Sequence, residues 1–141
     1  MKSVDIQVGR LLEIRVVAPV SMEDIHASEQ RLGHFFRLRS DKLIVVADYR
    51  RATVLAPEAA SRQLEIFRTF NPRVERSGIL VSRNAIFSMQ IERLVTNAKN
   101  PSRRAFHDPF ELKAFIGSAL NHEEHVRLAQ FLAEDAPEGQ R

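Results

Sequence analysis

The feature that most constrains the fold of this chain is an uninterrupted apolar run, Leu43-Ile-Val-Val-Ala47. A strand with one solvated face alternates apolar and polar residues, whereas a strand covered on both faces reads as a continuous apolar segment. The run therefore predicts a strand at the centre of a sheet that carries helices on both sides. Pro57 follows a few residues later and is well suited to the first turn of a helix, so a strand-to-helix junction is expected there.

Two segments near the N-terminus alternate apolar and polar residues, which is the period of half-buried strands. The apolar positions are Val4, Ile6 and Val8 in the first segment and Leu12, Ile14 and Val16 in the second. Only Gly9 and Arg10 separate the two segments, and a two-residue Gly-X loop suits a type II′ turn. The sequence therefore predicts an antiparallel hairpin.

Helices are predicted where apolar residues recur at helical spacing behind a capping residue. They are expected from Ser21 to about Leu38, from Pro57 to Phe70, from Asn84 to Asn100, from Asp108 to Leu120 and from Asn121 onward. Within the second of these, Ala60, Leu64, Phe67 and Phe70 share one face. Asn121 and Glu124 have the spacing of a capping box. Further strands are expected from Gly78 to Ser82 and, briefly, at Ala105 and Phe106.

Together these elements predict an α/β fold, with a mixed sheet of about five strands and four to five helices. The sheet combines the N-terminal hairpin with parallel strands and has Leu43 to Ala47 at its centre. Residues 1–134 are expected to form a single domain, and the polar tail 135–141 is expected to be disordered. The predicted buried residues include Ile44, Val46, Leu64, Phe67, Leu80, Leu94 and Phe115.

Composition excludes several classes of protein. The 141 residues contain no cysteine, so disulfides, thiolate metal sites and cysteine nucleophiles are ruled out. The formal net charge of +3 is too small to indicate a polyanion partner, and no aromatic side chains alternate with the basic ones as in a nucleic-acid surface. No apolar window is long enough for a membrane span and no secretory signal is visible, so a cytoplasmic protein is expected.

No motif predicts an enzyme, a metal site or a cofactor. The segment His122-Glu-Glu-His125 spaces its histidines three apart, whereas the helical zinc signature spaces them four apart. Weak adventitious metal binding is the alternative to a solvated helix start. His26, His34 and His107 are interpreted as surface or capping residues. The chain has only five glycines and no phosphate-binding glycine cluster or serine-hydrolase motif, so a non-catalytic protein is expected.

The order of elements and several short motifs resemble the STAS superfamily, in particular its SpoIIAA-like branch grouped with SEC14-type domains. The motifs are Leu43-Ile-Val-Val-Ala-Asp48 followed by Pro57 to Phe70, then Gly78-Ile-Leu-Val81, Leu94-Val95, Asn100 to Phe106 and Asp108-Pro-Phe-Glu111. The resemblance covers nearly the whole chain. It implies a regulatory fold of bacterial type that binds a protein partner.

The chain departs from that family at the family's phosphorylatable serine. The matching positions are Ala56, Pro57 and Glu58, so the hydroxyl is missing. Glu58 stands in the first turn of the helix, where a carboxylate either imitates a phosphate or simply stabilises the helix dipole. The resemblance implies that the junction formed by Asp48, Arg50, Arg51, Pro57 and Glu58 is a partner-binding site. Alternatively, Asp48 caps a turn or pairs with Arg50 or Arg51.

Two further surfaces are candidates. The helix after Asn84 buries Phe87, Ile91, Leu94 and Ala98, which turns Met89, Gln90 and Arg93 outward, with Ile86 at the margin, as a possible dimer surface. Arg103 and Arg104 are a candidate anion site, because arginine holds carboxylates and phosphates through a bidentate fork. The alternative for each pair of neighbouring arginines is a solvated surface.

The sequence thus predicts a non-catalytic module that binds a protein partner or a second copy of itself. The alternative is a carrier or sensor of a lipid-like or other small apolar ligand, since SEC14-type relatives enclose such ligands. No cofactor, metal, nucleic acid or membrane span is predicted.

Overall fold

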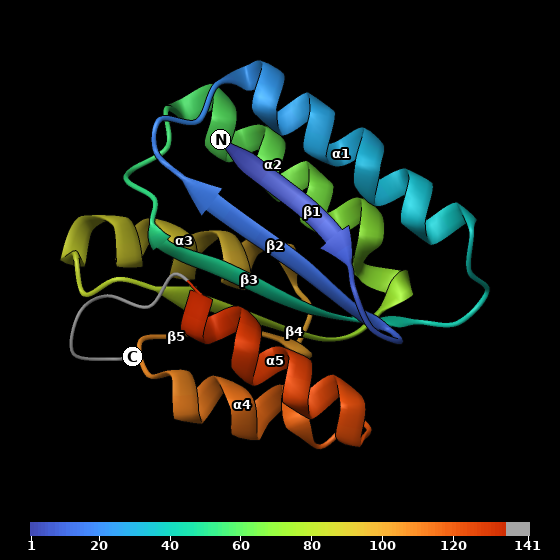
Figure 1. Ribbon diagram of the computed structural model, residues 1–141. Coiled ribbons are helices and arrows are strands. Elements are labelled where there is room, and N and C mark those ends of the chain that lie inside the picture. Colours follow the sequence, from blue (N-terminus) through green and yellow to red (C-terminus); the bar gives the residue numbers. More distant parts are fainter. Residues whose placement is uncertain (135–141) are drawn as a thin grey trace.

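Five strands form one sheet in the computed structural model, which describes residues 1–134 (Figure 1). In chain order they are β1 (Lys2–Ile6), β2 (Leu11–Val17), β3 (Leu43–Arg51), β4 (Val74–Val81) and β5 (Arg103–Phe106). They lie side by side in that same order. β1 is antiparallel to β2, and every later pair of neighbours is parallel. The predicted mixed sheet, made of a hairpin and parallel strands, is confirmed.

β3 is the central strand, as its apolar run predicts. Leu43, Val45 and Ala47 belong to the core on one face of the sheet, whereas Ile44 and Val46 belong to the core on the other face. Each of these five side chains is at most 7% exposed. Successive side chains of a strand point to opposite faces, so a strand needs a continuous apolar run to contribute to two cores.

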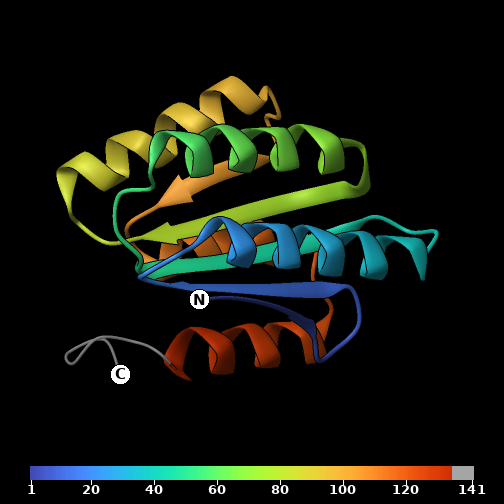
Figure 2. The same cartoon turned by 90° about the horizontal axis from the view of Figure 1, so that it is seen from above.

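Five α-helices cover the two faces (Figures 1 and 2). α1 (Met22–Arg37), α2 (Pro57–Phe70) and α3 (Ala85–Ala98) lie on one face, and α4 (Pro109–Gly117) and α5 (His122–Glu134) on the other. A short 3-10 helix, η1 (Asn71–Arg73), follows α2. The strand order advances in one direction from β2 to β5, and right-handed crossovers therefore place α1, α2 and α3 on the same face.

Polar side chains fix the starts of the helices. Ser21 and Asp24 form a reciprocal capping box at the start of α1. Asn121 and Glu124 repeat it before α5, with distances of 2.9 Å for both hydrogen bonds, as predicted. The carboxylate of Glu124 also accepts a hydrogen bond of 2.6 Å from the backbone N–H of Arg10. The start of α5 is therefore tied to the loop between β1 and β2.

That loop is longer than predicted. The strand register pairs Ile6 with Leu12, so residues 7–10 form the connection and the two-residue turn is wrong. Gly9 has φ of +56°, and a Cβ atom there would lie 2.3 Å from an oxygen of Glu124. The loop therefore bends to receive the buried Glu124 carboxylate, a contact from a distant part of the chain that the local pattern does not reveal.

The burial pattern departs from the prediction at two apolar residues. Leu64 and Phe115 were predicted to be buried and are half-buried. The buried residues of α2 are Ala59, Gln63, Ile66 and Phe67, so its inward stripe is rotated from the predicted one. The reason is that α2 packs between two helices on the sheet, which leaves Leu64 at the margin of the core. The other predicted core residues, Ile44, Val46, Phe67, Leu80 and Leu94, are buried.

Two predictions concern the limits of the chain and the membrane. The polar tail 135–141, predicted to be disordered, lies outside the described residues. Within residues 1–134, no helix has both the length and the apolar character that a membrane span requires.

Candidate functional site

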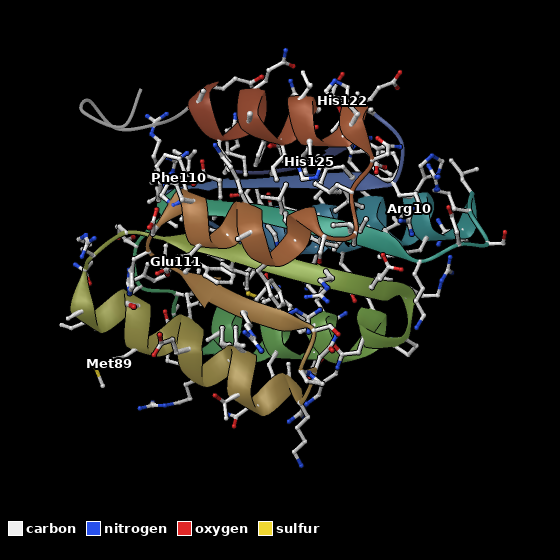
Figure 3. The ribbon with its side chains drawn as sticks, turned by 90° about the horizontal axis from the view of Figure 1, so that it is seen from below. Arg10, Met89, Phe110, Glu111, His122 and His125 are labelled. Carbon is white, nitrogen blue, oxygen red and sulfur yellow. The ribbon has the colours of Figure 1, made fainter. Side chains whose placement is uncertain are left out.

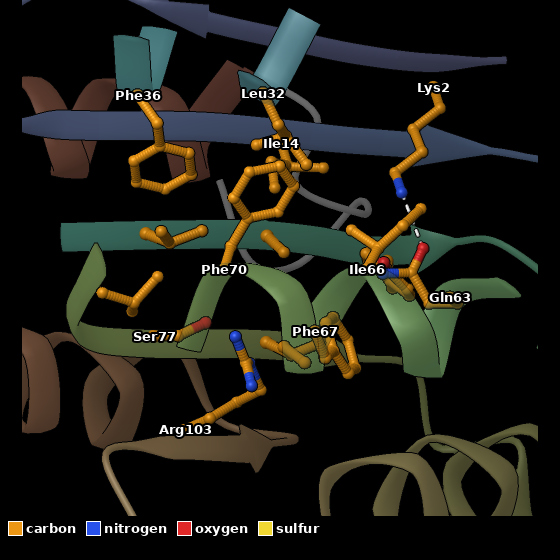
Figure 4. Close-up of a pocket in the computed structure, with 15 residues that line it drawn as sticks. Lys2, Ile14, Leu32, Phe36, Gln63, Ile66, Phe67, Phe70, Ser77 and Arg103 are labelled. Carbon is orange, nitrogen blue, oxygen red and sulfur yellow. Dashed lines mark hydrogen bonds between the residues drawn. The ribbon is translucent and has the colours of Figure 1, made fainter. Parts of the chain in front are cut away.

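A small cavity lies between the sheet and the pair of helices α1 and α2 (Figure 4). Its volume is about 30 Å³, which is room for roughly two water molecules. Apolar side chains form most of the wall, among them Phe36, Ile66, Phe67 and Phe70. The polar side chains in the wall are Lys2, Tyr49, Gln63, Ser77 and Arg103. An interior cavity with an apolar wall and a few polar groups is the usual form of a small-molecule site.

Arg103 is the most unusual of these side chains, because it is a buried cation without a carboxylate. It is 4% exposed, and within residues 1–134 no acidic side chain lies within ion-pair distance of it. Among these described residues, none accepts a hydrogen bond from its Nε. Its Cζ lies 4.4 Å from the centroid of the Phe67 ring. Burial lowers the pKa of Arg103 to about 10.

Asn71 holds the guanidinium of Arg103 in place. Arg103 Nη1 donates to Asn71 Oδ1 at 2.5 Å. The amide nitrogen of Asn71 donates to the carbonyl of Ala98 at 2.8 Å, so the oxygen of the amide must face Arg103. The orientation of Arg103 is therefore fixed by neutral groups alone.

Lys2 brings a second cation to the cavity, from the edge strand β1. Its Nζ donates to Gln63 Oε1 at 2.6 Å. Burial lowers the pKa of Lys2 to about 8, and the charge of Glu29 offsets only part of that effect. Glu29 is itself engaged by Arg62 in an ion pair and hydrogen bonds. Lys2 and Arg103 lie at opposite ends of the cavity (Figure 4).

Tyr49 and Ser77 come from the neighbouring strands β3 and β4. Tyr49 is 2% exposed and stacks on Phe87, with ring centroids 6.3 Å apart. Burial raises the pKa of the Tyr49 hydroxyl well above its usual value, so this group is neutral. Ser77 is paired in register with Arg103 on the neighbouring strand, and both side chains line the cavity. A hydroxyl and a guanidinium therefore stand next to each other at one end of the cavity.

Two stacked rings separate the cavity from the surface. Phe36 at the end of α1 and Phe70 at the end of α2 have ring centroids 4.9 Å apart. Both also line a surface groove of about 480 Å³ between α1 and α2. Phe70 is half-buried, and it lines both the groove and the cavity, as Phe36 does.

The structure does not bring the predicted switch junction together. Asp48 and Arg50 form a buried ion pair, with 2.8 Å between Asp48 Oδ2 and Arg50 Nη2, and Arg50 also donates to the carbonyl of Leu132 in α5. The pair therefore lies on the α4 and α5 face. Pro57 and Glu58 start α2, which covers the opposite face, and Arg51, Pro57 and Glu58 are exposed. The alternative prediction, in which Asp48 pairs with a neighbouring arginine, is confirmed.

The predicted dimer surface is only partly available. Ile86 and Met89 are 71% and 61% exposed, and Arg93 is exposed as well. Figure 3 shows Met89 pointing away from the body of the protein, and the same view shows Phe110, which is 76% exposed, at the start of α4. The side chain of Gln90, however, makes two hydrogen bonds of 2.8 Å to the backbone of Leu55. The assignment of Gln90 to a free surface is therefore wrong.

The two candidate anion-binding arginines differ in burial and in the face of the sheet to which they point. Arg104 is exposed, and its Cζ lies 4.9 Å from the centroid of the Phe115 ring on the opposite face of the sheet. The interpretation of both residues as solvated is wrong for Arg103. Neighbouring residues of a strand point to opposite faces, so extending the predicted strand at Ala105 back by two residues would have separated them. Lys2, Gln63 and Asn71 carry no local sequence signal for the cavity and were not predicted.

The histidines do not form a metal site. Within residues 1–134, no group of three or more potential metal ligands comes together. His122 and His125 lie at the start of α5 (Figure 3), and Glu124 between them is committed to the β1–β2 loop. His107 is half-buried, and its Nε2 lies 3.0 Å from the hydroxyl of Ser88 and its Nδ1 3.1 Å from the carbonyl of Ser82. It is a structural link between α3 and the end of β4 rather than a surface residue.

Among solved structures, this chain is similar to an uncharacterised protein of the DUF3478 family from Shewanella loihica, described as having a SpoIIAA-like fold. The two chains are 15% identical, with a TM-score of 0.63, and the alignment covers 82% of this chain and 93% of that one. No family model matches this chain, and neither does any curated protein. The likeness shows the fold, and the predicted SpoIIAA-like α/β domain is confirmed.

Proposed function

We propose that this chain is a non-catalytic STAS-type regulatory module that works by binding a small, partly apolar ligand between its sheet and the helices α1 and α2. The observation that supports this proposal is the cavity of about 30 Å³, with its apolar wall and its buried polar groups at either end. The stacked rings of Phe36 and Phe70 lie between the cavity and the groove of the two helices, which is where a ligand would enter. A ligand would enlarge the cavity by displacing these rings.

Native mass spectrometry of the protein purified from its own host tests this function. We expect a species heavier than the chain, which loses the additional mass when the protein is denatured. Replacing Phe70 with alanine should change how much ligand is retained, whereas replacing the exposed Phe110 should not, because Phe110 belongs to α4, which covers the other face of the sheet. Protein that carries nothing, and that acquires nothing from a host extract, would contradict the proposal.

A second proposed function, binding of a protein partner or of a second copy, is supported by the exposed apolar side chains of α3. Ile86 and Met89 lie there beside Arg93, an arrangement common at interfaces. If this surface forms a dimer, the double change Met89→Glu and Arg93→Glu should convert the dimer to a monomer in light scattering, with an unchanged helical signal. A wild-type chain that stays monomeric at high concentration would remove the surface from consideration.

We also propose that no phosphoswitch operates at the start of α2. Ala56 is the N-cap residue and provides no side-chain hydrogen bond, and the exposed Glu58 follows in the first turn. Intact mass of the protein from its host under several growth conditions tests this proposal. Stoichiometric phosphate on Thr53 or Ser61 would contradict it.

A further inference from the structure

Arg103 carries a buried guanidinium, 4% exposed, that faces no acidic side chain of residues 1–134. Among the described residues it has therefore lost its hydration without gaining a counter-charge. We propose that Arg103 binds the carboxylate of a small organic acid that occupies the cavity, so that the ligand supplies this negative charge. This inference rests on the proposed function and gives its ligand a chemical class.

The orientation of Arg103 fits this role. A carboxylate prefers to bind two parallel N–H groups of one guanidinium. Asn71 occupies Nη1, which is on the edge away from Nε. The edge that carries Nε, the atom without an acceptor, is therefore the one left for an incoming carboxylate. Ser77, paired in register with Arg103, adds a hydroxyl at the same end of the cavity.

The surroundings of Arg103 select for one negative charge and an apolar body. Lys2 is at the opposite end of the cavity and is hydrogen-bonded to Gln63, so a single cation faces the anion directly (Figure 4). A phosphate dianion would keep an uncompensated charge there, whereas a carboxylate would not. The free volume of about 30 Å³ admits a group of carboxylate size, and Ile66, Phe67 and Phe70 offer contacts to an aliphatic chain. These features together favour a monocarboxylic acid.

Calorimetric titration with hexanoate tests this inference, with hexanol as the uncharged ligand of the same chain length. On the wild-type protein we expect hexanoate to bind about tenfold or more tightly than hexanol, since a hydrogen bond to a charged group that is otherwise buried and unpaired is worth that factor or more. The change Arg103→Gln should abolish the difference. Arg104→Gln is the matched control and should leave it intact, because Arg104 points to the other face of the sheet.

The outcomes separate this inference from the function on which it rests. Equal binding of hexanoate and hexanol to the wild-type protein would contradict the proposal that Arg103 binds a carboxylate. It would still support a binding site for an apolar ligand. If neither compound nor the longer decanoate binds, both proposals fail. Tighter binding of decanoate than of hexanoate would support a fatty acid as the natural ligand, and the reverse would support a short-chain acid. The comparison of ligands on wild-type protein holds even if Arg103→Gln does not fold.

Discussion

The two faces of the sheet differ in how they hold buried charged side chains. On the α4 and α5 side, Asp48 meets Arg50 and Glu13 meets Arg127, with closest distances of 2.8 and 2.7 Å. On the α1 to α3 side, Glu29 and Arg62 form a part-exposed ion pair, but Arg103 and Lys2 enter the cavity against neutral partners, Asn71 and Gln63. Within residues 1–134, no acidic side chain lines the cavity that these two cations enter.

The difference indicates that the paired charges under α4 and α5 are structural, whereas the cations of the cavity serve to bind a ligand. A buried ion pair orients the elements that carry it. Arg127 joins α5 to Glu13 of β2, and Arg50, paired with Asp48, donates to the carbonyl of Leu132 in α5. A buried cation without a counter-charge lowers stability and is retained where a ligand completes it. Changing one charge at a time on each face tests this difference.

The largest change in the free energy of unfolding is expected on the face covered by α4 and α5. Asp48→Asn removes the carboxylate of the buried ion pair with Arg50 and should lower the free energy of unfolding by about 3 to 5 kcal/mol. Urea denaturation followed by circular dichroism measures the loss. The double change Asp48→Leu and Arg50→Met should recover most of it, because it replaces both charges of the pair with apolar side chains. An Asp48→Asn protein as stable as the wild type would contradict the role assigned to the pair.

A gain in the free energy of unfolding is expected on the cavity face, which is the face covered by α1 to α3. Arg103→Met removes an unpaired charge, and Asn71 keeps a hydrogen bond from Asn100, so the free energy of unfolding without ligand should rise by about 1 kcal/mol. The same denaturation experiment measures it. Arg104→Met, the exposed neighbour, should change the free energy by less than about 0.5 kcal/mol. If Arg103→Met is destabilised as strongly as Asp48→Asn, then Arg103 is a structural residue.

Lys2 gives the cavity face a characteristic pH dependence. Its pKa is lowered to about 8 in the folded protein, whereas it is 10.5 for an ordinary lysine. Between these values the unfolded chain binds more protons than the folded one, so the stability of the wild type should rise with pH. Relative to Lys2→Met, the wild type should gain about 2 kcal/mol between roughly pH 7.5 and pH 10.

The control for that experiment is Lys42→Met, since Lys42 is exposed and should show no such difference from the wild type. Thermal unfolding at a series of pH values is sufficient to compare the three proteins. A difference between wild type and Lys2→Met that stays constant over this range would mean that Lys2 titrates as a solvated lysine.

The smallest effect is expected outside both cores, at Glu58. Glu58→Gln removes an exposed carboxylate from the first turn of α2 and should lower the free energy of unfolding by about 0.5 kcal/mol at low salt. Added salt should remove most of this effect, because the interaction is screened. A salt-independent loss of several kcal/mol would show that Glu58 has a partner other than the helix terminus.

Much of the fold could be predicted because its determinants are local. The apolar run at Leu43 to Ala47 identifies the central strand, and Ser21, Asn84 and Asn121 each stand at the cap of a helix as predicted. The connection at Gly9 could not be predicted, because its shape depends on Glu124, which is distant in sequence. Local patterns carry no information on such contacts.

The candidate site was harder to predict for the same reason. Arg103 was identified as an anion-binding candidate, but only the strand register separates it from Arg104 and turns it inward. Lys2, Gln63 and Asn71 approach the cavity from three different elements. The residues of the predicted switch junction are divided, because Asp48 and Pro57, although close in sequence, lie on opposite faces of the sheet.

The NMR resonance of the Arg103 Nε–H tests most directly whether this group donates to a ligand from outside the chain. The signal is assigned by its absence from Arg103→Lys protein. On titration with hexanoate, we expect the Nε–H proton to move downfield as it donates to the carboxylate, and hexanol should leave it in place. If hexanoate at saturating concentration does not move the Arg103 signal, then Arg103 does not bind the carboxylate.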